Sequence, residues 1–201
     1  MSGITVTPIP NKVFGATVTG VSLRDIGDAD FAAVHAAFLK YGFLVFPGQF
    51  LTDAENIAFG QRFGELEFGA MPLSNQARSK DGTLGEIFEV NSRRMRSAIG
   101  NEGWHTDSTY KPLSSKCAML SAVVVPDEGG QTEFADMRAA YAALDDATRA
   151  RIETLSAYHS IVFSQANDLG DFPTLQDGVN YHGEAYLRPL VKQHPETGVK
   201  N

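Results

Sequence analysis

A histidine and an aspartate separated by one residue, His105 and Asp107, are the side chains of this chain best suited to chemistry. Residues two positions apart in an extended segment point to the same side, so this imidazole and carboxylate can bind one metal ion together. Two histidines and one carboxylate form the Fe(II) site of non-haem oxygenases, which leaves coordination positions free for a cosubstrate and oxygen. The alternative is a surface triplet without a ligand, as most His-x-Asp sequences are, so the neighbouring motifs decide the interpretation.

Three motifs with chemistry-bearing residues follow one another along the chain: Trp-His-Thr-Asp-Ser-Thr-Tyr (104–110), Gly-Gly-Gln-Thr-Glu-Phe-Ala-Asp (129–136) and His-Pro-Glu-Thr-Gly (194–198). Together with Leu-Val-Phe-Pro-Gly-Gln (44–49) and Phe-Gly-Gln-Arg-Phe-Gly (59–64), this order resembles the taurine dioxygenase (TauD/TfdA) family of Fe(II)/2-oxoglutarate oxygenases. Within that family the chain most resembles the branch that cleaves phenoxyalkanoate herbicides, such as 2,4-dichlorophenoxyacetate and phenoxypropionates. The similarity spans nearly the whole sequence.

The resemblance implies a metal and cosubstrate site. His105 and Asp107 would be two of the three protein ligands of Fe(2+) and the catalytic pair, with 2-oxoglutarate as cosubstrate and O2 as oxidant. Thr132 matches the family threonine that hydrogen-bonds the distal carboxylate of 2-oxoglutarate. A hydroxyl suits that place because an unpaired buried carboxylate is costly. The alternative for Thr132 is a strand threonine after a Gly-Gly turn.

Two residues are candidates for binding the substrate. Asn101 matches a family substrate contact at the edge of the metal pocket, and its alternative is a turn asparagine between two glycines. Arg96 is a candidate for holding a substrate carboxylate through its guanidinium. Its alternative is a solvated loop, which is the favoured interpretation for the neighbouring Arg93 and Arg94.

Two further side chains invite a role. Trp104 is suited to stacking on an aromatic substrate, but we expect it to pack in the core behind the metal loop, because in an extended segment it faces away from His105. Cys117 begins an apolar run, so a buried, inert thiol is expected rather than a nucleophile.

The function that the resemblance implies is hydroxylation of a small organic acid, an aryloxyalkanoate, at the carbon beside its ether oxygen. The product would collapse to a phenol and a 2-oxo acid, while 2-oxoglutarate becomes succinate and CO2. A taurine or sulfonate dioxygenase is the alternative enzyme, since an arginine suits either anion. An inactive jelly-roll binding protein is the alternative of another class.

The third iron ligand is missing from the pattern. In the family a second histidine and an arginine follow well after the His-Pro-Glu-Thr-Gly motif, and this chain ends at Asn201. None of the other histidines is a convincing substitute; they are His35, His159, His182 and His194. We therefore expect a domain over residues 1–201 that is incomplete at its C-terminus.

The elements that must position these residues follow from local patterns. Thr52 and Glu55 predict a capping box, while Asp28, Asp136 and Asp145 or Asp146 predict further helix starts. Four helices are expected: one at 28–41, one at 52–63, one that begins at 136, and one that runs from 145 or 146 to about 155. Alternating or β-branched runs predict strands at 4–6, 13–21, 43–46, 86–90, 117–125, 131–135, 158–164 and 185–192. The fold class is mixed α/β with a mainly antiparallel sheet, a double-stranded β-helix (jelly roll) core with flanking helices whose C-terminal strands are missing.

Composition bounds the rest. A chain of 201 residues with 43% hydrophobic residues suits a single domain with a sizeable core. Its net charge of −7 gives no general attraction to nucleic acid or an anionic membrane. We expect a cytoplasmic protein without a membrane span. The sequence has one cysteine, no basic and apolar leader at its N-terminus and no long apolar run. Relatives in such families often form homo-oligomers, which the sequence itself does not decide.

Overall fold

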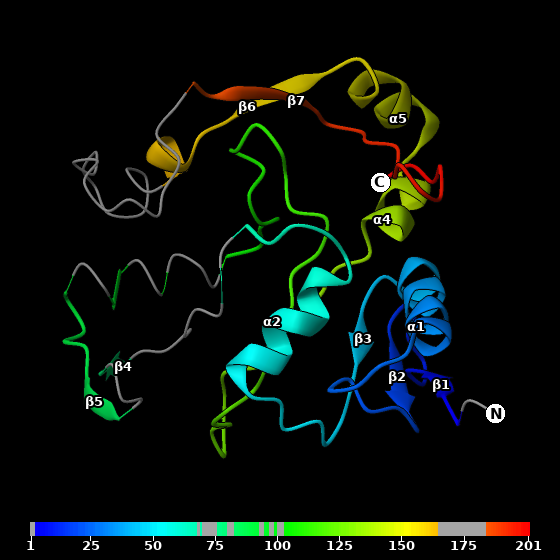
Figure 1. Ribbon diagram of the computed structural model, residues 1–201. Helices are drawn as coiled ribbons and strands as arrows, with labels where there is room; N and C mark the ends of the chain where they lie inside the picture. Colours follow the sequence, from blue (N-terminus) through cyan, green and yellow to red (C-terminus); the bar gives the residue numbers. More distant parts are fainter. Residues whose placement is uncertain are drawn as a thin grey trace. The chain divides into compact units, whose positions relative to one another are not determined.

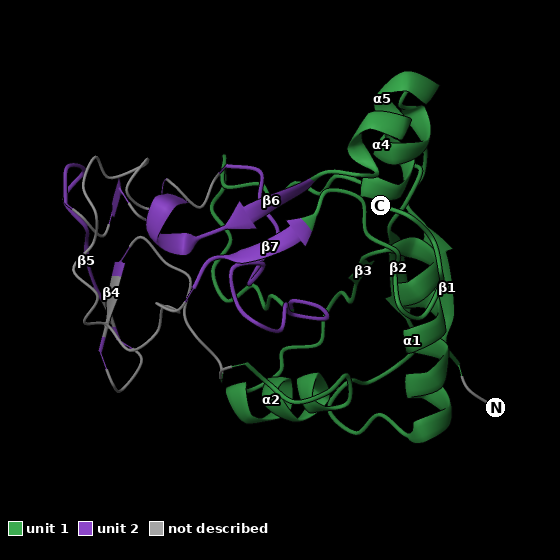
Figure 2. Cartoon of the chain, turned by 90° about the horizontal axis from the view of Figure 1, so that it is seen from above, with its two compact units in different colours: residues 1–70, 119–155, 189–201 green, residues 71–118, 156–188 purple. Residues whose placement is uncertain are grey.

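The computed structural model describes residues 3–67, 69, 76–79, 83–92, 95–96, 99, 103–164 and 184–201. The chain forms two compact units (Figure 2). Unit 1 comprises residues 1–70, 119–155 and 189–201, and unit 2 comprises 71–118 and 156–188. The single domain expected over 1–201 stays a prediction.

A three-stranded sheet begins unit 1, with the order β1 (Thr5–Pro8), β2 (Ala16–Thr19) and β3 (Leu44–Val45). β1 and β2 are antiparallel, while β2 and β3 are parallel. The alternation in β2 places Ala16 and Val18 in the core, where both are fully buried, and turns the threonines away from it. The short strands predicted near the N-terminus are confirmed.

Two helices complete the core of unit 1: α1 (Asp28–Tyr41), drawn beside this sheet in Figure 1, and α2 (Asp53–Gln61). α1 ends at Gly42, whose φ of 80° lies in the left-handed region that favours glycine. α2 starts at the predicted capping box. Buried side chains from the sheet, from both helices and from the loop between β2 and α1 form the core cluster: Val18, Leu23, Val34 and Phe59.

Two short helices follow in unit 1, α4 (Met137–Ala143) and α5 (Asp146–Ile152). Both start where an aspartate side chain accepts hydrogen bonds from the first turn, Asp136 for α4 and Asp145 for α5. These two predicted helix starts are confirmed.

The strands predicted at 117–125 and 131–135 are wrong for this structure, in which both segments are irregular. A strand needs a main-chain partner, and no described strand pairs with either segment. Val123, Val124 and Val125 are consequently 72–75% exposed. Phe134 instead stacks on Phe43, with ring centroids 4.5 Å apart.

Strand pairs make up most of the described regular structure of unit 2, while residues 161–164, predicted as the end of a strand, are helical. β4 (Gln76–Arg78) and β5 (Leu84–Ile87) are antiparallel. β6 (Ser156–His159) and β7 (Tyr186–Pro189) form a second two-stranded sheet, whose last residue, Pro189, falls in unit 1. A mixed α/β architecture rich in antiparallel pairs is thus confirmed, and the jelly roll stays a prediction. Among the described helices, none is both long and apolar enough to traverse a bilayer.

Candidate functional site

His105 and Asp107 lie in unit 2, in a segment of bends and turns rather than in a strand. Their side chains nevertheless converge, with Nε2 of His105 and Oδ1 of Asp107 3.2 Å apart. Ser108 makes the turn that follows: its φ of 56° is left-handed, and it is buried. The turn closes with a 3.1 Å hydrogen bond that the amide of Lys111 donates to the carbonyl of Ser108. The two donor atoms thus meet in an irregular segment at the start of this turn.

The hydrogen bond made by Nδ1 of His105 determines that Nε2 is the nitrogen that faces Asp107. Nδ1 lies 2.7 Å from the carbonyl oxygen of Gly103. A carbonyl only accepts, so this bond requires the hydrogen on Nδ1 and leaves Nε2 toward the carboxylate. Metal-binding histidines are oriented in this manner, with the other ring N–H donated to a backbone carbonyl.

The donor set fits a metal ion. Ligands at right angles with bonds of about 2.1 Å are separated by about 3 Å, close to the observed distance. The side chains of His105 and Asp107 are 54% and 56% exposed, which leaves room for further ligands on the open side. Within the described residues no group of three histidine, cysteine or acidic side chains is placed to hold an ion, so a third protein ligand is not found there.

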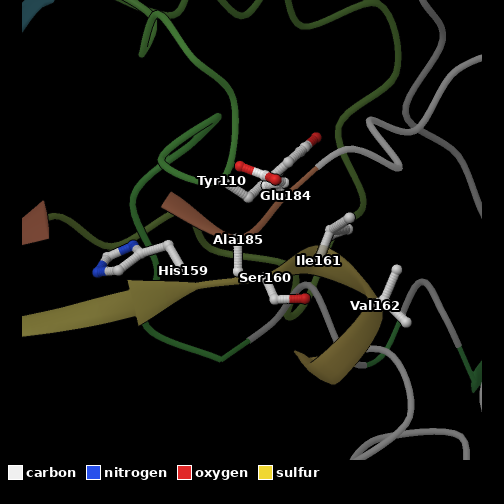
Figure 3. Close-up of a pocket in the computed structure, with 7 residues that line it drawn as sticks. All are labelled: Tyr110, His159, Ser160, Ile161, Val162, Glu184 and Ala185. Carbon is white, nitrogen blue, oxygen red and sulfur yellow. The ribbon is translucent and has the colours of Figure 1, made fainter. Parts of the chain in front are cut away.

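A small hollow, open to solvent, lies beside Tyr110 (Figure 3). Tyr110, three residues after Asp107, lies with Glu184 on one side of it, and residues 160–162 lie on the other. His159 stands at the end of β6 and shares a 2.7 Å hydrogen bond with the hydroxyl of Thr109. None of the predicted site residues that the structure describes lines this hollow.

The residues predicted to bind the cosubstrate and the substrate lie in different parts of the chain. Thr132 is exposed in unit 1, after Gly129 and Gly130, which both have positive φ. Arg96 is exposed in unit 2. Asn101 lies outside the described residues, as do Arg93 and Arg94. The roles assigned to Thr132, Arg96 and Asn101 stay predictions.

The predictions for Trp104 and Cys117 have different outcomes. Trp104 was expected to pack in the core and is 71% exposed, so that prediction is wrong. The extended geometry on which it depended is absent, since 103–110 bends and turns. Cys117 is half-buried, and burial raises the pKa of its thiol, which lowers the fraction of reactive thiolate at neutral pH.

The other described histidines have structural partners. His35 in α1 lies 3.4 Å from the carboxylate of Glu196. Nδ1 of His194 accepts hydrogen bonds from the amides of Glu196 and Thr197, so the His-Pro-Glu-Thr-Gly motif forms a tight turn. His182 lies outside the described residues. The sequence interpretation missed Arg188, which binds main-chain carbonyls of 109–112; no local pattern predicts so distant a contact.

Comparison with known proteins identifies the family of the chain. Residues 5–201 match the family model described as taurine catabolism dioxygenase TauD, TfdA family. The chain belongs to this family.

Two curated relatives and one solved structure are especially similar. An (S)-phenoxypropionate/alpha-ketoglutarate-dioxygenase from Sphingobium herbicidovorans is 50% identical over 95% of this chain and 67% of its own. An alpha-ketoglutarate-dependent 2,4-dichlorophenoxyacetate dioxygenase from Cupriavidus pinatubonensis is 37% identical over 94% of this chain and 69% of its own. The crystal structure of AAD-2 in complex with Mn(II) and N-oxalylglycine superposes with a TM-score of 0.85 at 38% identity, covering 98% of this chain and 69% of the other. This family member therefore resembles dioxygenases that use alpha-ketoglutarate.

Proposed function

We propose that this protein is an Fe(II)- and 2-oxoglutarate-dependent dioxygenase that oxidises an aryloxyalkanoate. The observation that carries the proposal is the convergence of Nε2 of His105 and Oδ1 of Asp107 to 3.2 Å. It occurs in a chain 50% identical to a phenoxypropionate dioxygenase over 196 residues. The Mn(II) and N-oxalylglycine bound by the similar AAD-2 support a divalent metal beside a small dicarboxylate.

In this proposal His105 and Asp107 bind the ferrous ion from one side. The Gly103 carbonyl keeps the His105 ring in the tautomer whose Nε2 is free to bind. The ion, with 2-oxoglutarate and O2, supplies the oxidising chemistry that inserts one oxygen atom into a C–H bond of the substrate and one into succinate, with release of CO2. A third protein ligand remains to be assigned.

The other predicted residues position the two acids. Thr132 donates its hydroxyl to the distal carboxylate of 2-oxoglutarate, Arg96 pairs with the substrate carboxylate, and Asn101 contacts the substrate at the edge of the metal pocket. Hydroxylation of the carbon beside the ether oxygen gives a product that breaks its C–O bond. The phenol and a 2-oxo acid then leave.

Two alternatives are tested by the same assay. A sulfonate dioxygenase is favoured by the taurine reaction in the description of the matched family. A binding protein without catalysis is the other alternative, and in that case substrate would bind with no turnover of 2-oxoglutarate.

The experiment measures succinate released by the full-length gene product with ferrous iron, ascorbate and 2-oxoglutarate. We expect phenoxypropionates and 2,4-dichlorophenoxyacetate to stimulate succinate release and taurine to leave it at background. His105→Ala should abolish the stimulation, while His35→Ala, a histidine of α1 paired with Glu196, should retain it. Stimulation by taurine alone would favour the sulfonate reaction, and background release with every acid would contradict the proposal.

A further inference from the structure

His159 and Arg188, from the β6–β7 sheet, form hydrogen bonds with the segment that contains His105 and Asp107. This segment, residues 103–112, is called the ligand segment. Nδ1 of His159, at the end of β6, lies 2.7 Å from Oγ1 of Thr109, fifty positions away in the sequence. Thr109 follows Asp107 by two residues. The bond joins a half-buried ring to the turn immediately after the aspartate.

Arg188 in β7 holds the main chain of the same turn. Its Nε donates a 3.1 Å hydrogen bond to the carbonyl of Thr109, and one terminal nitrogen donates to the carbonyls of Lys111 and Pro112. A guanidinium offers its donors in one rigid plane, so three carbonyls bound together fix the path of the backbone rather than a single point. A lysine, with a single nitrogen, could not reproduce this set.

Both side chains belong to one two-stranded sheet, because β6 and β7 pair with each other and lie side by side in Figure 2. Between Thr109 and Asp107 stands only Ser108, which is 7% exposed and has a left-handed φ of 56°. A buried residue in this conformation has little freedom to pivot. The position of Thr109 therefore constrains the path of the backbone at Asp107.

We propose that His159 and Arg188 are positioning residues, which hold the ligand segment so that His105 and Asp107 face a common divalent metal ion. The inference rests on the proposed function in one respect, that these two side chains bind the ion. Neither His159 nor Arg188 touches the ion itself. They act through Thr109 and the carbonyls of the ligand segment.

A purely structural role would predict a different outcome. If the contacts only stabilised unit 2, their loss would lower thermal stability while folded protein bound metal as before. If they orient the ligands, folded variants should bind metal more weakly, since residues that orient metal ligands typically contribute 10–100-fold in affinity. Metal affinity at a temperature where every variant is folded separates the two.

The experiment compares Mn(II) dissociation constants, in the presence of N-oxalylglycine, for the full-length protein and matched pairs of variants. Thr109→Val and His159→Leu remove the shared hydrogen bond, whereas Thr109→Ser keeps the hydroxyl and His159→Asn keeps a polar atom near the place of Nδ1. Arg188→Met removes the guanidinium, with Arg151→Met on exposed α5 as its control. Amide hydrogen exchange of residues 104–111, measured without metal, reports the order of the ligand segment directly.

We expect Thr109→Val, His159→Leu and Arg188→Met each to weaken Mn(II) binding about tenfold and to speed exchange of the ligand segment. Thr109→Ser, His159→Asn and Arg151→Met should stay within about twofold of the parent protein. The double variant Thr109→Val/His159→Leu should lose less than the sum of the two single losses, because both changes remove the same hydrogen bond.

The outcomes separate this inference from the proposed function. A parent protein that binds no Mn(II) would overturn both. A parent protein that binds Mn(II), with folded Thr109→Val, His159→Leu and Arg188→Met binding it equally well, would overturn only the positioning role. Additive losses in the double variant, or equal losses in the conservative variants, would also contradict it.

Discussion

At the scale of single residues, the sequence predicted that His105 and Asp107 act as a pair, and the structure shows that their side chains converge. The spacing of His105 and Asp107 predicted two ligands on one side, and their donor atoms lie 3.2 Å apart. The setting differs from the expected one, since they lie in an irregular segment at the start of a turn rather than in a strand. The same wrong assumption about extension placed Trp104 in the core, although it is 71% exposed.

The thiol of Cys117 provides a test at this scale. Burial raises its pKa above the ordinary value, so less of it is ionised at neutral pH and its reaction with disulfide reagents should be slower than in unfolded protein. The measurement is the rate of thiol modification at pH 7.5 in native buffer and in denaturant. Equal rates in the two conditions would show that the native structure does not protect the thiol.

At the scale of elements, most helix ends were predictable and long strands were not. Asp28, expected to cap α1, is instead its first residue, and the cap position is Gly27, without a side-chain hydrogen bond. Helix ends are determined by residues close to them in the sequence, so the local pattern is enough to predict them. Examples are the capping box of Thr52 and Glu55, the aspartates before α4 and α5, and the glycine after α1. A strand depends on a partner elsewhere in the chain. The apolar run at 117–125 satisfies the strand pattern and still has no paired strand in the described structure.

Asp136 joins two helices and gives a prediction about pH. It caps α4 and binds Arg138, which in turn donates to the carbonyl of Lys40 at the end of α1. Burial raises the pKa of the Asp136 carboxyl, but the hydrogen bonds from Arg138 and the backbone outweigh it and the net pKa is lowered. The charged form is therefore favoured by folding. Its contribution is present at neutral pH and is lost as the pH falls through the lowered pKa.

Asp136→Asn should keep the helix cap and lose the charge. We expect it to lower the free energy of unfolding by about 1–2 kcal/mol at pH 7, the size of a hydrogen bond to a charged group. The difference from the parent protein should shrink below about pH 4, where the carboxyl of the unfolded chain is protonated. Urea unfolding at both pH values is the measurement, with Asp127→Asn in an exposed loop as the control. A difference that does not depend on pH would contradict the role of the charge.

At the scale of the whole molecule, family membership was predictable because its motifs span the chain, and the matched model covers residues 5–201. The long-range packing was not, because it depends on pairings that no motif encodes. The exposed run of Val123, Val124 and Val125 is the clearest example, each valine being 72–75% exposed. Contiguous apolar surface of this kind promotes association.

Self-association of the 201-residue chain is the corresponding prediction. Val124→Lys should reduce it, because a lysine places a charge within the apolar run. Val13→Lys is the matched control, since Val13 is 81% exposed and lies in a different loop. Sedimentation velocity over a range of concentrations measures the effect. A parent chain that stays monomeric throughout would contradict the prediction.

The central claim is that His105 and Asp107 together bind the divalent metal ion. Isothermal titration of the full-length protein with Mn(II), in the presence of N-oxalylglycine, tests it most directly. We predict one bound ion per chain, with binding lost in His105→Ala and in Asp107→Ala and retained in the controls His35→Ala and Asp127→Ala. Unchanged affinity in both His105→Ala and Asp107→Ala would show that the metal, and with it the oxygenase chemistry, belongs elsewhere.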